Sequence, residues 1–283
     1  MSSVSASDPG RLSDTGLVGA AKHAVQRTLR GLHLAFLQRP LPRRIALYFH
    51  EIDSATEAAL DAIIPFFKRQ GYSFVKAREY DEDASPERRM VFVSFDDNYL
   101  GWHEHLPFFA KHGVKVGFYC NSLPLDRASD DPVVADYYRR LGNPADRRPL
   151  RSVHLRDMAE AGHDIGCHSH SHFNLAALDA PVVQDELRLN RQMIQNATGS
   201  DASEFSFPFG QPRHLPASVE QQVRSAGFAR IAHATSGMLH ASVPRGTIHR
   251  SMWRTERNFN ANLAELKVDG QWFVRRFGRS PLG

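Results

Sequence analysis

Residues 90–97, MVFVSFDD, form an apolar run that ends in two aspartates. A run of this length, rich in β-branched and aromatic residues, is typical of a strand buried on both faces of a parallel sheet. Successive side chains of a strand point to opposite faces, so the carboxylates of Asp96 and Asp97 should diverge. One carboxylate could bind a metal ion while the other faces a substrate, although such pairs are also common in surface turns.

Further strand patterns alternate with helical ones on both sides of this run. The strands are predicted at residues 44–49, 73–75, 114–120, 164–167, 205–207, 229–232 and 247–252. The helices are predicted at 55–70, 102–112, 153–161, 181–198, 216–226 and 261–277, and residues 121–150 are expected to form an inserted loop. This alternation predicts the α/β class, as a distorted (β/α) barrel with about seven parallel strands in one domain. An open doubly wound sheet is the alternative.

The N-terminal part of the chain differs from the rest. Residues 1–16 are rich in Ser, Asp and Gly and are expected to be disordered. Residues 17–42 predict a helical extension, and residues 43–283 form the predicted α/β domain. A basic amphipathic helix over residues 17–38 would either pack on this domain or make peripheral contact with a membrane.

Composition limits the partners and the compartment. The chain has 35 Lys and Arg against 31 Asp and Glu, a net charge of +4, and carries no nucleic-acid motif. We therefore expect no nucleic-acid partner. Two cysteines cannot form a disulfide framework, and no secretory signal is apparent at the N-terminus. A cytoplasmic location is expected, with peripheral attachment to the inner face of the membrane as an additional possibility.

Three histidines follow the predicted strand at residues 164–167. They lie in residues 168–172, HSHSH. Neutral imidazoles are good ligands for Zn²⁺ and related metals. If the segment begins to coil, His168 and His172 are one helical turn apart and can face one ion, while His170 points elsewhere. A histidine-rich surface loop is the alternative.

These residues resemble the motifs of the polysaccharide deacetylases, the NodB homology domain or carbohydrate esterase family four. The resemblance covers roughly residues 44–252 and concerns segments 94–97, 168–172 and 205–211. It implies that Asp97, His168 and His172 bind a divalent cation, with zinc (Zn²⁺) as the first expectation, and that Asp96 is the catalytic base. It also implies that the third segment lines the substrate groove, through Phe207, Pro208, Phe209 and Gly210.

Two positions depart from the family pattern. Many members have an arginine before the proline of the third motif, where it orients the base, but this chain has Ser206. Many also have a Leu-x-His near the C-terminus that provides the catalytic acid, and no clear copy is present here. Residues 47–50, LYFH, instead resemble a segment of poly-N-acetylglucosamine deacetylases, which makes His50 the predicted acid.

The resemblance implies a metal-dependent hydrolase that removes N-acetyl groups from an amino-sugar-containing polysaccharide, oligosaccharide or lipid-linked glycan. The expected partner is therefore an N-acetylated glycan, with Tyr99 and Trp253 as further candidates for contacts with sugar rings. Two alternatives stay open. One is hydrolysis of another non-peptide C–N bond, in a formamide or a small cyclic amide. The other is a catalytically silent glycan-binding protein.

Overall fold

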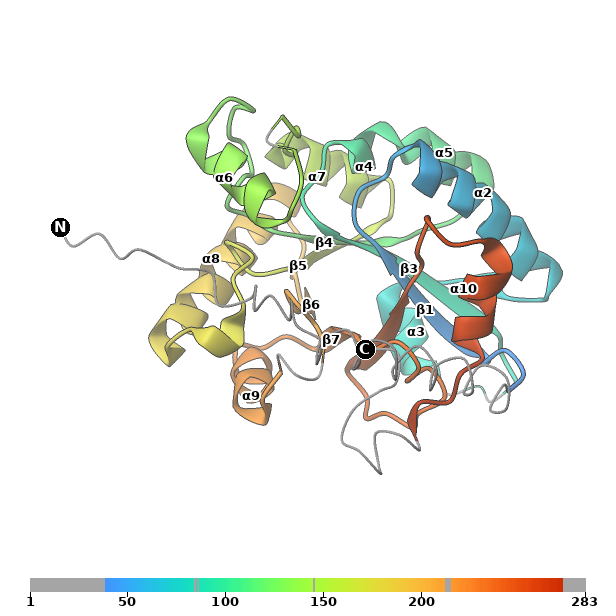
Figure 1. Ribbon diagram of the computed structural model, residues 1–283. Helices are drawn as coiled ribbons and strands as arrows, with labels where there is room; N and C mark the ends of the chain where they lie inside the picture. Colours follow the sequence, from blue (N-terminus) through green and yellow to red (C-terminus); the bar gives the residue numbers. More distant parts are fainter. Residues whose placement is uncertain (1–38, 84, 86, 145, 212–214, 272–283) are drawn as a thin grey trace, which may run out of the picture.

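The computed structural model describes residues 39–83, 85, 87–144, 146–211 and 215–271. Seven parallel strands of this part close into a barrel in the order β1-β8-β7-β6-β5-β4-β3, and β3 pairs again with β1 (Figure 1). The strands are β1 (Arg44–Phe49), β3 (Met90–Asp97), β4 (Gly117–Cys120), β5 (Asp164–Cys167), β6 (Glu204–Ser206), β7 (Arg230–Ala234) and β8 (Thr247–Met252). A short strand, β2 (Ser73–Phe74), pairs with the start of β3. The predicted single-domain barrel is confirmed, and the doubly wound alternative is wrong because β1 and β3 close the sheet.

Helices surround the barrel (Figure 1). They are α2 (Ser54–Arg69), α3 (Ala77–Glu82), α4 (Gly101–Glu104), α5 (Leu106–His112), α6 (Pro132–Arg140), α7 (Ser152–Glu160), α8 (Ala180–Thr198), α9 (Ala217–Ser225) and α10 (Phe259–Leu266), with a 3₁₀ turn, η1 (Leu175–Ala177). Side chains that cap the first backbone N–H groups explain where several of these helices begin. Asp53, for example, accepts a hydrogen bond of 2.8 Å from the backbone N–H of Thr56 at the start of α2.

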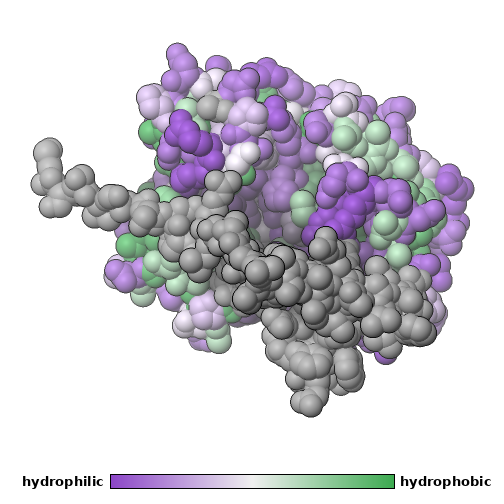
Figure 2. All heavy atoms as spheres, viewed as in Figure 1, coloured by the Kyte–Doolittle hydropathy of each residue, from purple (hydrophilic) through white to green (hydrophobic). Residues whose placement is uncertain are grey.

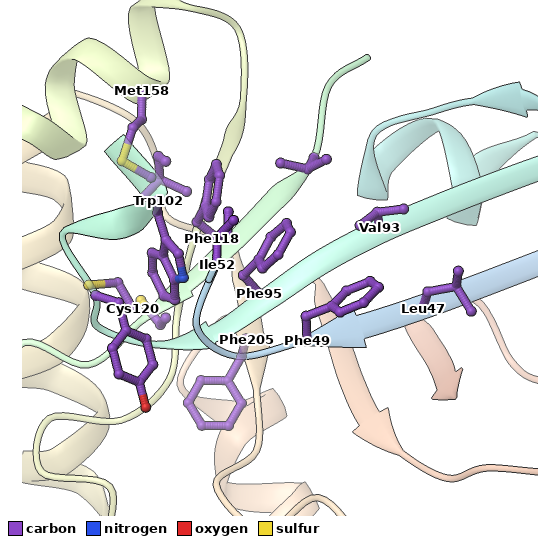
Figure 3. Close-up of a cluster of buried hydrophobic side chains, with 14 of the residues drawn as sticks. Leu47, Phe49, Ile52, Val93, Phe95, Trp102, Phe118, Cys120, Met158 and Phe205 are labelled. Carbon is purple, nitrogen blue, oxygen red and sulfur yellow. The ribbon is translucent and has the colours of Figure 1, made fainter. Parts of the chain in front are cut away.

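Both faces of the strands are buried, as the continuous apolar run of β3 predicts. Outward side chains form the main core under the helices. Figure 3 shows part of it, where Phe95 stacks on Phe49 and Phe118 with ring centroids 5.5 and 5.3 Å apart. Inward side chains such as Phe92 and Tyr119 fill the barrel itself. The barrel interior is therefore packed, and open space is left to the ends of the strands.

Two strand glycines make room for this filling. A Cβ on Gly117 would lie 2.9 Å from the ring of Phe92, and one on Gly166 would lie 2.6 Å from the ring of Tyr119. Real Cβ atoms do not approach so closely, so the aromatic rings occupy the space that larger residues at these positions would need. The layer above these rings, toward the carboxyl ends of the strands, is polar.

Three predicted segments need correction. Residues 121–150 contain the helix α6, which begins where Asp131 caps the N–H of Val133 and Pro132 takes the first turn. The helix predicted at 102–112 is divided into α4 and α5 at His105. The C-terminal helix predicted at 261–277 ends at Leu266, and its last part lies outside the described residues.

The predicted disordered segment 1–16 and the predicted helix at 17–38 also lie outside the described residues. Within the described part, no helix is long and apolar enough to cross a membrane. The coloured part of the face in Figure 2 is mostly hydrophilic, with smaller apolar areas between.

Candidate active site

Side chains that follow β1, β3, β5 and β6 meet at the carboxyl ends of the strands, as expected for a parallel barrel. They surround a cavity of about 360 Å³. Most of the predicted site residues line it, namely His50, Asp96, Asp97, Tyr99, His168, His172, Phe207, Phe209 and Gly210. The cavity is therefore the place where chemistry can occur.

Asp97, His168 and His172 form one cluster. Their potential ligand atoms all lie within 4.8 Å of one another. Asp97 Oδ1 is 3.2 Å from Nε2 of His172 and 3.6 Å from Nε2 of His168. Asp97 and His168 are buried, and His172 is nearly so. Three potential metal-ligand atoms, from two segments that are distant in the sequence, are thus close enough to bind one ion.

A hydrogen bond orients the imidazole of His168. Nδ1 of His168 lies 2.7 Å from the backbone oxygen of Ser206, so it carries the proton and leaves Nε2 as the acceptor. Ser169 and His172 adopt left-handed backbone conformations with φ of 62°. The segment is therefore an irregular turn and not the helical turn expected from the sequence. His170 points away, with Nδ1 2.9 Å from the hydroxyl of Ser122.

The charge states of this cluster fit a divalent cation. Burial alone would raise the pKa of Asp97, but the neighbouring His168 and His172 hold it below its ordinary value, so the carboxylate is ionised. Burial lowers the pKa of His172 to about 4, so its imidazole is neutral. Oδ1 of Asp97 is buried and accepts no hydrogen bond from the described residues. A buried anionic oxygen beside the imidazoles of His168 and His172 is a donor set suited to Zn²⁺ or a related ion.

Asp96 has an entirely different partner. Arg250, on β8, donates hydrogen bonds of 2.7 Å to each of its carboxylate oxygens. This arginine has no exposed surface, and its guanidinium lies 4.8 and 5.2 Å from the rings of Tyr48 and Tyr119. Burial would raise the pKa of Asp96, yet Arg250 holds it below its ordinary value. The carboxylate is therefore ionised and fixed in orientation.

The arginine expected before Pro208 is thus replaced from another strand. Ser206 donates a hydrogen bond of 3.2 Å to Asp96 and accepts one of 2.6 Å from Arg250. Sequence reasoning missed Arg250, although a signal was present. In the predicted strand 247–252, residue 250 shares a face with the buried Ile248, and a lone arginine on that face needs a buried anion.

His50 lies directly after β1, the strand that pairs with β3, and lines the cavity. Its ring packs edge-on against Tyr48, with centroids 5.7 Å apart. Its backbone carbonyl accepts a hydrogen bond of 2.8 Å from the indole of Trp102, which fixes the loop that carries it. His50 therefore shares the cavity with Asp96 and the ligand cluster.

Two predicted substrate contacts are not in the cavity. Trp253 is 4% exposed and packs on Phe259 with ring centroids 5.2 Å apart, so it belongs to the apolar core. The alternation from Arg250 explains this, since residue 253 falls on the outer face of the barrel. Pro208 is buried and does not line the cavity. Phe209, in contrast, is 47% exposed and lies beside His172, with ring centroids 5.1 Å apart.

Fold and site together define a closed (β/α) barrel with a candidate divalent-metal centre at its carboxyl rim. The family model described as polysaccharide deacetylase matches residues 83–231. The chain therefore belongs to the polysaccharide deacetylase family. No curated protein gives a significant match.

Three solved structures with the same fold illustrate the likeness. A de-N-acetylase from Aggregatibacter actinomycetemcomitans has a TM-score of 0.62 and 16% identity, covering 78% of this chain and 98% of that one. IcaB from Ammonifex degensii has a TM-score of 0.60 and 15% identity, covering 78% and 96%. The deacetylase PplD from Streptococcus pyogenes has a TM-score of 0.58 and 14% identity, covering 80% and 99%. At these identities the likeness establishes the fold.

Proposed function

We propose that this chain is a metal-dependent hydrolase that removes N-acetyl groups from an amino-sugar-containing polysaccharide, oligosaccharide or lipid-linked glycan. One observation carries the proposal. Two adjacent carboxylates at the end of β3 have separate environments, Asp96 paired with Arg250 and Asp97 turned toward His168 and His172. Such a division suits one carboxylate to metal binding and the other to proton transfer.

Asp97, His168 and His172 would hold the cation. When bound, a divalent cation such as Zn²⁺ polarises an amide carbonyl and lowers the pKa of water. Asp96 would accept the proton of the attacking water at a carboxylate oxygen, since Arg250 keeps that group ionised and oriented. His50, which shares the cavity, would donate a proton to the departing amine. Acetate and a free amino sugar would result.

The cavity supports an amino sugar as the group that enters it. Its volume of about 360 Å³ lies in the range of small-ligand sites. Phe209 presents an exposed ring beside His172, as a face on which a sugar could stack. PplD, which shares the fold, was solved in complex with acetate, and this agrees with acetate as the product here.

The test is an acetate-release assay with metal-loaded protein across N-acetylated glycans, in which formate is measured in parallel. Release of formate from a formamide substrate would favour the alternative C–N hydrolase. The Asp96→Asn variant should bind metal like the wild type and lose activity by about 10²–10⁴-fold, the contribution of a general base. A fully active Asp96→Asn protein would refute the assignment. The buried pair of Asp96 and Arg250 argues against a catalytically silent protein, because it gives the base an arginine partner that the third motif lacks.

The basic pattern of residues 17–38 supports attachment to an anionic membrane surface from the cytoplasmic side. Deleting residues 1–40 and fractionating cells tests this part of the proposal. An unchanged distribution between membrane and soluble fractions would remove it.

A further inference from the structure

The segment between β4 and α7, residues 121–150, continues from the carboxyl end of β4, which lies between the two strands that carry the ligand cluster, β3 and β5 (Figure 1). Tyr137 and Tyr138 of α6 are completely buried. The hydroxyl of Tyr138 donates a hydrogen bond of 2.7 Å to the backbone oxygen of Asn98, the residue after Asp97. The hydroxyl of Tyr137 donates one of 2.7 Å to the side chain of Asn121. We call this segment the α6 insertion.

The α6 insertion also reaches the histidine segment. The amide of Asn121 donates hydrogen bonds to the backbone oxygens of His168 and Ser169. Arg140, at the end of α6, donates a hydrogen bond of 3.0 Å to the backbone oxygen of Ser171. The insertion therefore holds the backbone on both sides of the ligand cluster.

One side-chain connection reaches a ligand directly. Asn143, in the loop after α6, donates a hydrogen bond of 2.6 Å to the hydroxyl of Tyr99. The same hydroxyl lies 3.3 Å from Oδ2 of Asp97 and donates to it. Tyr99 is 3% exposed, so water does not compete freely for this contact. Oδ2 is thereby engaged, while Oδ1 is the oxygen that faces the imidazole of His172 at 3.2 Å.

We propose that Tyr99 is a positioning residue for Asp97 and that Asn143 holds Tyr99 in place, so that the α6 insertion helps to set the affinity for the divalent cation. This inference rests on the metal site of the proposed function. The torsion of a carboxylate about its last bond is broad, so an Asp97 without a partner at Oδ2 would sample other orientations. The hydroxyl of Tyr99 removes this freedom before the cation binds. Partners of this kind typically change metal affinity by about 10–100-fold.

The experiment measures Zn²⁺ affinity of the whole chain by competition with a chromophoric chelator, independently of any substrate. Tyr99→Phe removes the hydroxyl but keeps the ring that packs on Tyr138 and Trp102. We expect its dissociation constant for Zn²⁺ to rise by about 10–100-fold. Asn143→Leu should weaken binding less. The double variant should bind no more weakly than Tyr99→Phe alone, because the two residues act in series.

Tyr138→Phe is the matched control. It loses a hydroxyl bond of 2.7 Å to a backbone oxygen beside Asp97, with no bond to the carboxylate. Its Zn²⁺ affinity should stay at the wild-type level. Folding of each variant is verified by circular dichroism. The proposal is overturned if Tyr99→Phe binds Zn²⁺ like the wild type, or if Tyr138→Phe loses as much affinity. A wild-type chain that binds Zn²⁺ but releases no acetate would count against the proposed substrate alone, whereas one that binds no divalent cation would refute the metal site itself.

Discussion

Replacing Arg250 with methionine removes one member of a fully buried ion pair and leaves Asp96 without its main partner. Arg250 also donates hydrogen bonds to the hydroxyls of Ser94 and Ser206, but the two to Asp96, both 2.7 Å long, are the ones that join charged groups. Hydrogen bonds of charged groups contribute roughly 1.5–3 kcal/mol each, so about 3–6 kcal/mol is at stake. Removal of one member of a buried pair costs about 3–5 kcal/mol, which agrees with this sum. The free energy of unfolding at neutral pH should fall by that amount.

The pH dependence that Asp96 gives to the free energy of unfolding should change sign in the Arg250→Met variant. In the wild type the pKa of Asp96 is below its ordinary value of 3.8, so its ionisation stabilises the fold above that pH. That stability is lost as the pH falls through the lower native pKa. Without Arg250, burial is the dominant influence and raises the pKa above 3.8. The free energy of unfolding of the variant should then fall as the pH rises from 3.8, the ordinary pKa, to the raised pKa of Asp96 in the folded variant. Its activity should be lowest in acid and recover in part as the pH rises.

Two measurements test this reasoning. Urea unfolding of chelator-treated protein is followed from about pH 3 to pH 9, so that it includes the ordinary pKa of Asp96. The kcat/KM of metal-loaded protein is measured between pH 5 and pH 9. Arg230→Met is the control. Arg230 is also largely buried and pairs with Glu204 at 3.1 Å, but at the other end of the barrel. The Arg230→Met substitution should lower the free energy of unfolding without shifting the acid side of the pH profile of kcat/KM. If Arg250→Met keeps a wild-type pH profile of activity, Arg250 does not hold the base.

Three further changes test other parts of the structure. His172→Gln should weaken Zn²⁺ binding by more than ~100-fold in a calorimetric titration, because loss of an outer partner alone costs ~10–100-fold; unchanged affinity would exclude His172 as a ligand. His50→Gln should lower kcat by about 10²–10⁴-fold with metal affinity retained, and an unchanged kcat would exclude it as the acid. Gly166→Ala should lower the free energy of unfolding in urea by about 1–3 kcal/mol, because its Cβ would overlap the ring of Tyr119. A stable Gly166→Ala protein would contradict the packing described for the barrel interior.

The fold and much of the site could be predicted because short patterns specify them. An apolar run such as residues 90–97 predicts a buried strand wherever it occurs, and parallel strands bring their carboxyl ends together. This geometry alone predicts that Asp97 and His168 approach each other. The structure confirms the approach, with Asp97 Oδ1 3.6 Å from His168 Nε2.

Other features depend on partners that are distant in the sequence. Arg250 contacts Asp96 only because closure of the barrel places β8 and β3 on either side of β1, and no local pattern pairs residues 154 positions apart. The α6 insertion has a polar sequence that resembles a loop, and buried side chains such as Tyr137 and Tyr138 fix its place in the structure. Trp253 was misassigned for the opposite reason, since an aromatic residue near a strand end suits a sugar site and a core equally well.

Backbone strain is the feature of the site that the sequence hides most completely. Among the described residues, six that are not glycine have positive φ, and four of these, Asp97, Ser169, His172 and Phe209, surround the ligand cluster. Each such conformation costs on the order of 1–3 kcal/mol and persists only where the surroundings determine it. At Asp97 the φ of 89° interrupts the alternation of β3. Asp96 points to Arg250 within the barrel, while the carboxylate of Asp97 faces the imidazoles at its rim. The backbone N–H of Asn121 bonds the carbonyl of Asp97 at 2.9 Å, so the sheet itself holds this conformation. The ligand geometry is thus built into the barrel before any cation binds.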